Sequence, residues 1–295
     1  LIITLISIVF TLYAFETYLI FGGIDQLNIK KIEMLNKRIE LYKKRTGKDD
    51  YDTREIFNVY KDLKKKDNSV QVAVYPYLNE NLENKIFPLS GISNVPTILC
   101  NENGYYAIYE SDRYGFNNPD EDWDKEEIEF LLIGDSHAHG ACVNRPNDLS
   151  SVLSSLSNKP SLSIGYGGNS ILFIYATLRE YLRTNVKYVL WIYLEPDIED
   201  LNRDLKYITL NKYLVDLNYS QNLKSKQNEI DEILIQKISI EENKYKINFN
   251  LLKFIKLYQL RIIINSYLPK EYLPIDVPKP LLYDKFKDIM ILTND

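Results

Sequence analysis

Apolar residues in the second half of the chain switch between short continuous runs and a helical spacing. The run Phe130–Ile133 ends at a glycine, which is the pattern of a buried strand. Two further short strands are predicted at Ser161–Ile164 and Tyr188–Tyr193. Between them, apolar residues keep helical spacing at Leu149–Leu156 and Ile171–Arg183. Strands separated by helices of this length predict right-handed crossovers and a parallel sheet.

The residues on either side of this region have other patterns. Residues 24–125 show little sustained periodicity, although short strands are predicted over Val70–Val74 and Tyr105–Tyr109. After Leu201 the spacing predicts helices, which are clearest at Ile230–Ile240, Ile247–Ile264 and Leu281–Ile291. We expect these helices to form the outer layer of the fold.

The segment Leu1–Phe21 is nearly all apolar, with Glu16 as its one charge. A membrane-spanning helix needs roughly 20 apolar residues, so residues 1–23 are predicted to be a transmembrane anchor. A cleavable signal peptide is one alternative, although no Ala-x-Ala cleavage site follows the apolar run. A buried core helix is the other. The anchor interpretation makes the protein a single-pass membrane protein.

The side of the membrane stays open in this interpretation. Basic residues follow the apolar run, and the positive-inside rule favours a cytoplasmic position for such residues. The rule compares two flanks, however, and only one flank lies in this chain. A periplasmic or extracellular position is expected for the catalytic part. The basic residues are Lys30, Lys31, Lys37, Arg38, Lys43, Lys44, Arg45 and Lys48.

Composition excludes several function classes. The formal net charge of −5 at pH 7 argues against a nucleic-acid partner, because nucleic-acid-binding domains are normally basic. Cys100 and Cys142 are too few for a disulfide framework or a zinc finger, and they indicate no redox compartment. The chain also contains only two histidines, His137 and His139. No cofactor is expected.

The first strand of the parallel sheet leads directly into Gly134-Asp135-Ser136 and then His137-Ala138-His139-Gly140. A serine there lies at the carboxyl edge of the sheet, where open α/β folds place their sites. The N-terminus of a following helix offers backbone N–H groups that can bind a developing oxyanion. Asp and Ser are also ordinary helix caps, so the position after a buried strand is what favours chemistry here.

Three segments of the sequence together resemble the SGNH (GDSL-type) hydrolase family, in its membrane-anchored bacterial form. The first is Gly134-Asp135-Ser136, and the second is the glycine-rich turn at residues 163–169, Ser-Ile-Gly-Tyr-Gly-Gly-Asn. The third is the strand Val189–Leu194, which runs into Glu195-Pro196-Asp197. The lead-in over residues 111–117 also looks like that of anchored members.

This resemblance implies a three-layer α/β/α, flavodoxin-like parallel sheet. The expected organisation is a transmembrane helix over 1–23, a membrane-proximal α+β region over 24–125, and an SGNH-like domain over 126–295. That last domain lacks the family's final strands, and we interpret the sequence as a segment cut at both ends.

The resemblance also implies roles for individual residues. Ser136 is the expected nucleophile, with its own backbone N–H and that of Gly168 as oxyanion donors. Glycine at such a turn lets the backbone approach a substrate. A tight strand-to-helix turn is the alternative explanation for Gly165, Gly167 and Gly168. Asp135 and His139 are expected to support the site.

The third segment departs from the family pattern, which places a glycine and an asparagine here. Pro196 and Asp197 stand in this region instead. An ionised carboxylate cannot donate a hydrogen bond to an oxyanion. Asp197 is therefore protonated, or another group such as Asn169 donates, or the site is impaired.

The family's Asp-x-x-His pair, which supplies the general base and its orienting carboxylate, is absent, because no histidine follows His139. Truncation is the simplest explanation, and a dead enzyme is the alternative; in either case this segment is expected to be inactive. His137 adjoins the nucleophile but should project elsewhere. His139 is expected to pack or to orient the loop. No metal site is expected, and Cys142 is expected to be a small buried residue and not a nucleophile.

Three functions are consistent with these residues. The first is a serine esterase or deacylase acting on ester-linked acyl groups of an envelope glycan or lipid. The second is an O-acyltransferase that moves such a group onto a glycan. The third is a non-catalytic envelope protein that keeps the fold. Beyond the acylated substrate, the membrane is the expected partner.

Overall fold

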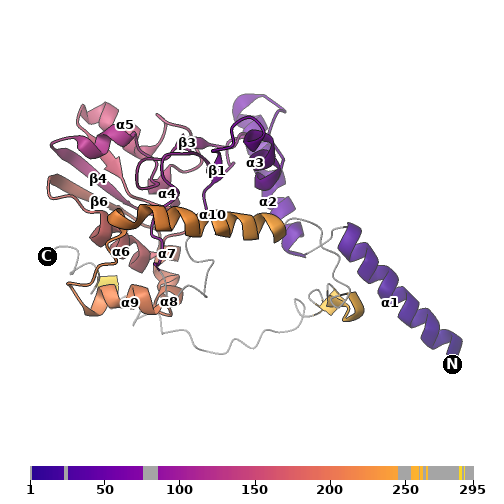
Figure 1. Cartoon of the computed structure of the whole chain (residues 1–295). Helices are drawn as coiled ribbons and strands as arrows, with labels where there is room; N and C mark the ends of the chain where they lie inside the picture. Colours follow the sequence, from indigo (N-terminus) through magenta and orange to yellow (C-terminus); the bar gives the residue numbers. More distant parts are fainter. Residues whose placement is uncertain are drawn as a thin grey trace. The chain divides into compact units, whose positions relative to one another are not determined.

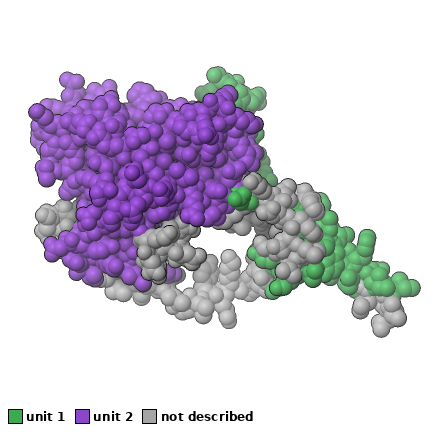
Figure 2. Space-filling view, viewed as in Figure 1, with its two compact units in different colours: residues 1–53, 243–274 green, residues 54–242, 275–295 purple. Residues whose placement is uncertain are grey.

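The computed structural model describes residues 2–22, 26–75 and 86–244, and beyond them residues 254–258, 260, 261, 264, 286, 287 and 289. The chain divides into two compact units (Figure 2). Unit 1 comprises residues 1–53 and 243–274, and unit 2 comprises residues 54–242 and 275–295.

Unit 1 contains the helices α1 (Ile2–Gly22) and α2 (Gln26–Thr46). The carboxylate of Glu16 is fully buried and accepts a hydrogen bond from the backbone N–H of Leu260 at 2.9 Å. The Tyr13 hydroxyl donates to the carbonyl of Ile255 at 2.9 Å, and its ring packs on Phe254. The polar groups of α1 thus have protein partners within this unit.

The predicted membrane anchor is not found. No helix in the described part of the chain is at once long enough and apolar enough to span a bilayer. The predictions of a transmembrane helix over residues 1–23 and of a single-pass membrane localisation are therefore wrong. The apolar run of α1 is interrupted by hydroxyl side chains and by Glu16, whose carboxylate is buried against Leu260.

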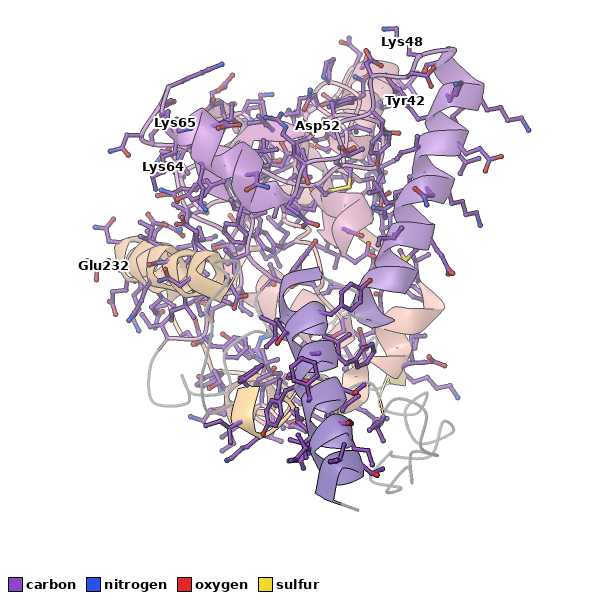
Figure 3. All side chains as sticks on the ribbon, turned by 90° about the vertical axis from the view of Figure 1, so that its right-hand side faces the viewer. Tyr42, Lys48, Asp52, Lys64, Lys65 and Glu232 are labelled. Atoms are coloured by element: carbon purple, nitrogen blue, oxygen red, sulfur yellow. A yellow bond between two sulfur atoms is a disulfide. The ribbon has the colours of Figure 1, made fainter. Side chains whose placement is uncertain are left out.

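The last turn of α2 is basic, and residues of the segment that follows it contact this end of the helix. Lys43, Lys44 and Arg45 lie in the last turn of α2, where positive charge complements the helix dipole. Lys43 pairs with Asp49 at 2.8 Å. The Tyr42 hydroxyl, labelled in Figure 3, donates to Asp50 at 2.6 Å.

Unit 2 contains two sheets of three strands each (Figure 1). One is all parallel, in the order β5 (Ser161–Ser163), β4 (Ile128–Gly134), β6 (Val186–Ile192). In the other, β2 (Pro96–Ile98) pairs in parallel with β1 (Gln71–Val72) and antiparallel with β3 (Ile108–Glu110).

Helices surround these strands. They are α3 (Ile56–Lys64), η2 (Asp120–Asp124), α4 (Ser136–His139), α5 (Leu149–Ser157), α6 (Ile171–Tyr181), α7 (Glu195–Glu199), α8 (Leu201–Asp204), α9 (Ile208–Val215), η3 (Leu223–Lys226) and α10 (Gln227–Lys244). Every residue of α6 except Arg179 is buried, so α6 is the central helix of the core and not an amphipathic surface helix.

The secondary structure predicted for the central region is confirmed. The three predicted strands correspond to β4, β5 and β6, and the two helices between them correspond to α5 and α6. The strand predicted over Val70–Val74 is shorter in the structure, where it is β1. The strand predicted over Tyr105–Tyr109 is shifted toward the C-terminus, where it is β3. The helices predicted over Ile247–Ile264 and Leu281–Ile291 lie mostly outside the described residues.

The predicted fold class, however, is wrong. In place of one extended parallel sheet between two helical layers, the described residues form two small sheets, and no helix among them can span a membrane. The parallel sheet ends at β6, whose residues Tyr188, Val189 and Leu190 are 37–49% exposed. Strands of a parallel sheet are normally covered on both faces, whereas these apolar residues of β6 are partly exposed in the described structure.

A buried carboxylate fixes the segment that leads into the parallel sheet. Asp112 is fully buried and accepts hydrogen bonds from the backbone N–H groups of Tyr114 and Phe116, from the Asn118 amide, and from the Trp123 indole, at 2.7–3.0 Å. Asn118 in turn exchanges two hydrogen bonds with the backbone of Ser163 in β5, at 2.7 and 2.8 Å. Asp112 thereby holds the end of β5 in place.

Candidate active site

The middle strand of the parallel sheet ends in a tight turn that presents Ser136. Strand β4 ends at Gly134 and helix α4 begins at Ser136, with Asp135 as the N-cap whose carboxylate accepts from the His137 N–H at 2.9 Å. Ser136 and His137 are exposed, whereas Asp135, Ala138 and His139 are buried. The Ser136 hydroxyl lies 3.4 Å from the second oxygen of Asp135. The turn therefore directs the serine hydroxyl toward solvent at the carboxyl end of the strand.

The glycine-rich turn after β5 packs directly on the turn at residues 134–136, which carries the proposed nucleophile and is called the nucleophile turn. The hydroxyl of Ser163 donates to the Ala138 carbonyl at 2.7 Å, and the N–H of Gly167 donates to His139 Nδ1 at 3.0 Å. Gly168 has a φ of +80°, a conformation that favours glycine. The second and first segments of the SGNH resemblance are thus brought together by the fold.

The two turns offer backbone donors that are not used inside the protein. Among the described residues, no acceptor is found for the N–H of Ser136 or for the N–H of Gly168. The Asn169 side chain is 1% exposed, and neither its amide nitrogen nor its amide oxygen has a hydrogen-bond partner in the described structure. Buried polar groups are normally paired, so the Asn169 amide is an exception in the described structure.

His139 is a buried, neutral side chain. Its Nδ1 accepts from Gly167, its Nε2 lies 3.0 Å from the Tyr109 hydroxyl, and its ring stacks on Tyr166 with centroids 4.4 Å apart. Burial lowers the pKa of His139 to about 3. Its second nitrogen is taken up by Tyr109, so His139 is not placed to accept a proton from Ser136, and it connects the nucleophile turn to the glycine-rich turn.

His137 makes its side-chain contact with Asp135 and not with Ser136 in the described structure. Its side chain is 49% exposed, and its Nδ1 lies 3.3 Å from the Asp135 carboxylate. In the described part of the chain, the one side-chain hydrogen bond of the Ser136 hydroxyl goes to Asp135. Neither histidine is therefore bonded to the serine hydroxyl.

Asp197 lies in the electrostatic field of the same turn. The pKa of Asp197 is raised to about 6, mainly by burial and to a smaller extent by the charges of Asp135 and Asp200, while the hydrogen bond from the Leu194 N–H and the charge of His137 oppose the shift. One carboxylate oxygen accepts from the N–H of Leu194 at 2.7 Å. The three segments of the resemblance therefore lie in one region. A pKa of about 6 means that the Asp197 side chain changes from neutral to negatively charged slightly below neutral pH.

Sequence reasoning missed two contacts behind the site. Cys100 and Cys142 form a disulfide across 42 residues of sequence, which connects the loop after β2 to the segment after α4. Tyr109 of β3 was not singled out either, because nothing in the local sequence connects it with His139. A lone pair of cysteines carried no spacing signal, so only the fold reveals the bond.

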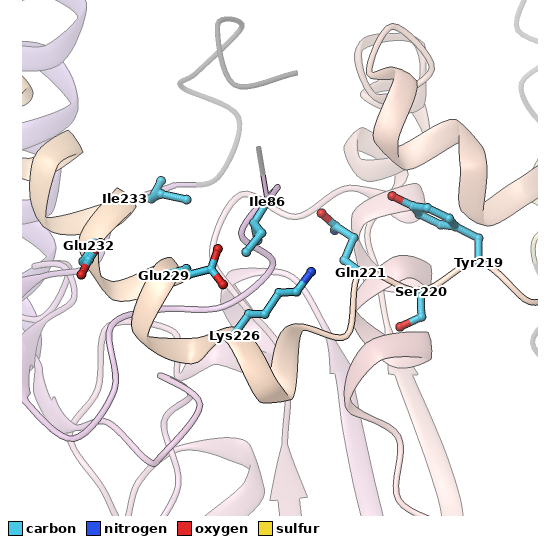
Figure 4. A pocket seen from close by; sticks show the side chains of 8 residues that line it. All are labelled: Ile86, Tyr219, Ser220, Gln221, Lys226, Glu229, Glu232 and Ile233. Carbon is cyan, nitrogen blue, oxygen red and sulfur yellow. The ribbon is translucent and has the colours of Figure 1, made fainter. Parts of the chain in front are cut away.

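A cavity lies elsewhere in unit 2. It has a volume of about 600 Å³ and is lined by eight residues, none of them from the nucleophile turn or the glycine-rich turn (Figure 4). They are Ile86, Tyr219, Ser220, Gln221, Lys226, Glu229, Glu232 and Ile233. No cluster of metal-ligating side chains occurs among the residues that the structure describes.

The chain matches no protein-family model, no curated protein and no solved structure. The resemblance to SGNH hydrolases inferred from the sequence therefore has no support from these comparisons.

Proposed function

We propose that this protein is a serine esterase or deacylase of SGNH type, which cleaves ester-linked acyl groups through Ser136. One observation carries the proposal. Ser136 is exposed at the start of α4, directly after the central strand of the parallel sheet, and two unpaired backbone N–H groups belong to the two turns that meet there. An exposed serine hydroxyl and unpaired backbone N–H groups are two of the features that acyl transfer to a serine uses.

In the proposed reaction the Ser136 oxygen attacks the ester carbonyl carbon, and a new C–O bond forms. The carbonyl electron pair moves onto the oxygen, where the N–H groups of Ser136 and Gly168 stabilise the negative charge. Collapse of this intermediate expels the alcohol and leaves an acyl-enzyme. Water then attacks the acyl carbon, which releases the carboxylic acid and restores the serine hydroxyl.

The oxyanion also needs a third donor, and Asn169 supports that role better than Asp197. The Asn169 amide is buried, unpartnered among the described residues and able to donate at any pH. Asp197 donates only when protonated, below a pKa of about 6. Above that pH its negative charge opposes the oxyanion.

The serine proton needs an acceptor. Neither histidine of the chain is bonded to the Ser136 hydroxyl among the described contacts, so we assign no general base within these residues. Added imidazole can take that place in an experiment. No contact described above favours a sugar hydroxyl over water as the acyl acceptor, so a transferase is not proposed.

The test is labelling by a fluorophosphonate probe, which forms a bond to a reactive serine and releases fluoride. We expect labelling at Ser136, identified by mass spectrometry of the labelled peptide, with a rate that rises with imidazole concentration. Ser136→Ala should abolish it. Ser154→Ala is the matched control, because Ser154 is half-buried on α5 and its hydroxyl bonds only the Lys159 carbonyl among the described contacts. Equal labelling of wild type and Ser136→Ala contradicts the proposal.

A non-catalytic protein is the second candidate, and one observation favours it. Asp197 stands where an oxyanion donor is expected and already accepts from Leu194, while the serine hydroxyl has no histidine partner in the described contacts. Under this alternative, even saturating imidazole yields no labelling of Ser136 in the folded protein.

A further inference from the structure

A chain of hydrogen bonds runs from the second sheet to the glycine-rich turn through His139. The Tyr109 hydroxyl, on β3, lies 3.0 Å from His139 Nε2, and His139 Nδ1 lies 3.0 Å from the backbone nitrogen of Gly167. Tyr109 is paired with Thr97, its cross-strand neighbour on β2. This series of hydrogen bonds therefore begins at Tyr109, in a paired strand, and ends at Gly167, the residue before Gly168.

The directions of these bonds follow from the partners. A backbone N–H can only donate, so His139 Nδ1 accepts from Gly167 and carries no proton. A neutral imidazole then carries its proton on Nε2, and that N–H donates to the Tyr109 oxygen. A low pKa of about 3, caused by burial, keeps His139 neutral in ordinary conditions.

The surroundings hold the imidazole in this one orientation. Its ring stacks on Tyr166, with the planes 23° apart, and meets the Tyr109 ring edge-on with centroids 5.3 Å apart. His139 is 1% exposed and Tyr109 is 5% exposed. The backbone carbonyl of His139 accepts from the Asn117 amide at 2.9 Å. Neither the ring nor its backbone can turn without breaking a buried hydrogen bond.

We propose that Tyr109 and His139 are positioning residues for acyl transfer at Ser136, an inference that rests on the proposed function. By holding the Gly167 N–H, His139 fixes the Tyr166–Gly167 peptide. The next peptide along the chain carries the Gly168 N–H, so the direction of that donor is set from a held peptide through the φ and ψ angles of Gly167 alone. Tyr109 acts through His139, because it fixes the tautomer and the ring. Neither residue touches the substrate.

Two substitutions of His139 separate the two hydrogen bonds. In His139→Asn the side-chain oxygen takes the place of Nδ1, so the bond to Gly167 is kept and the bond to Tyr109 is lost. In His139→Gln the terminal amide reaches the place of Nε2, so the bond to Tyr109 is kept and the bond to Gly167 is lost. Tyr109→Phe removes one hydroxyl from an unchanged ring and is the least disruptive variant.

Two measurements are made on each variant. The first is the imidazole-assisted labelling of Ser136, resolved into the probe's half-saturation concentration and the maximal rate. The second is hydrogen exchange of the Gly167 amide, followed by NMR.

We expect His139→Asn to keep a protected Gly167 amide and a maximal labelling rate within about 3-fold of wild type. His139→Gln should lose the protection of the Gly167 amide. Its maximal labelling rate should fall by about 10- to 100-fold with little change in the half-saturation concentration, because misplaced groups lower reactivity more than binding. Tyr109→Phe should lie between them.

Each alternative outcome has a distinct meaning. If exchange follows this pattern but all variants label equally, the positioning role is overturned while the proposed function stands. If both His139 variants lose protection and label equally slowly, a merely structural role for His139 replaces the proposal. If wild type itself is not labelled with imidazole, the proposed function fails, and the positioning role fails with it.

Discussion

Gly165 lies so close to Ala138 that a Cβ on residue 165 would stand 2.2 Å from the Ala138 Cβ and 2.8 Å from its carbonyl carbon. This contact joins the glycine-rich turn to the helix that carries Ser136. Only a residue without a side chain allows the two turns to approach this closely. The position of Ser136 relative to Gly168 therefore depends on residue 165 being a glycine.

Gly165→Ala is expected to destabilise the protein by about 1–3 kcal/mol, because the added methyl overlaps Ala138 in a packed region. Urea unfolding measures the loss. The matched control is the double variant Gly165→Ala with Ala138→Gly. It removes the Ala138 methyl group that the new methyl group on residue 165 would overlap. Its destabilisation should be smaller than the sum of the two single changes. Strict additivity would show that the two residues do not interact.

The disulfide holds the backbone beyond the nucleophile helix. Cys142 and its neighbour Ala141 have φ values of +56° and +47°, which are unfavourable for residues with a side chain, and Cys142 is bonded to Cys100. We expect reduction, or replacement of both cysteines by serine, to lower stability by about 2–4 kcal/mol. Denaturant unfolding with and without a dithiol reductant measures this. The double serine variant should not respond to the reductant, and equal midpoints for oxidised and reduced wild type would contradict the prediction.

Asp112→Ala is expected to cost about 3–5 kcal/mol, because it leaves four buried donors without an acceptor and each unsatisfied donor is expensive. Asp112→Asn should be nearly as harmful, since its amide nitrogen places a donor against donors. Thermal unfolding compares both with Asp216→Asn, a change at an exposed aspartate. A loss below about 1 kcal/mol for Asp112→Ala, the usual range for a single net hydrogen bond, would refute the role given to this carboxylate.

Asp197 is expected to make labelling of Ser136 dependent on pH. Burial raises the pKa of Asp197 to about 6, so the side chain is a neutral donor below that pH and an anion above it. Asp197→Asn stays neutral throughout. The labelling rate of Asp197→Asn divided by that of wild type should therefore rise as pH increases through about 6, on the order of 10-fold at its plateau. Taking this ratio cancels the titration of imidazole. A ratio that is constant from acidic to alkaline pH would show that Asp197 does not act on the oxyanion.

Local patterns predicted the elements that carry the site. The run Phe130–Ile133 and the glycine after it predicted β4 and the turn to Ser136, and the spacing of Ile171–Arg183 predicted α6. These predictions hold because a strand and a helix each follow from residues that are neighbours in sequence. Hydropathy alone was misleading for α1, where the carboxylate of Glu16 is buried against Leu260, far away in the chain.

The sequence by itself determined where the strands of the parallel sheet and the helices between them form, and that Ser136 follows the first of these strands. Only the tertiary structure decided the extent of the sheets, the pairing of Cys100 with Cys142, and the bonds of His139 to Tyr109 and Gly167. The physical reason is range. Backbone propensity and apolar periodicity act over one or two turns of chain, whereas these contacts join residues that only folding brings together, so no local pattern encodes them.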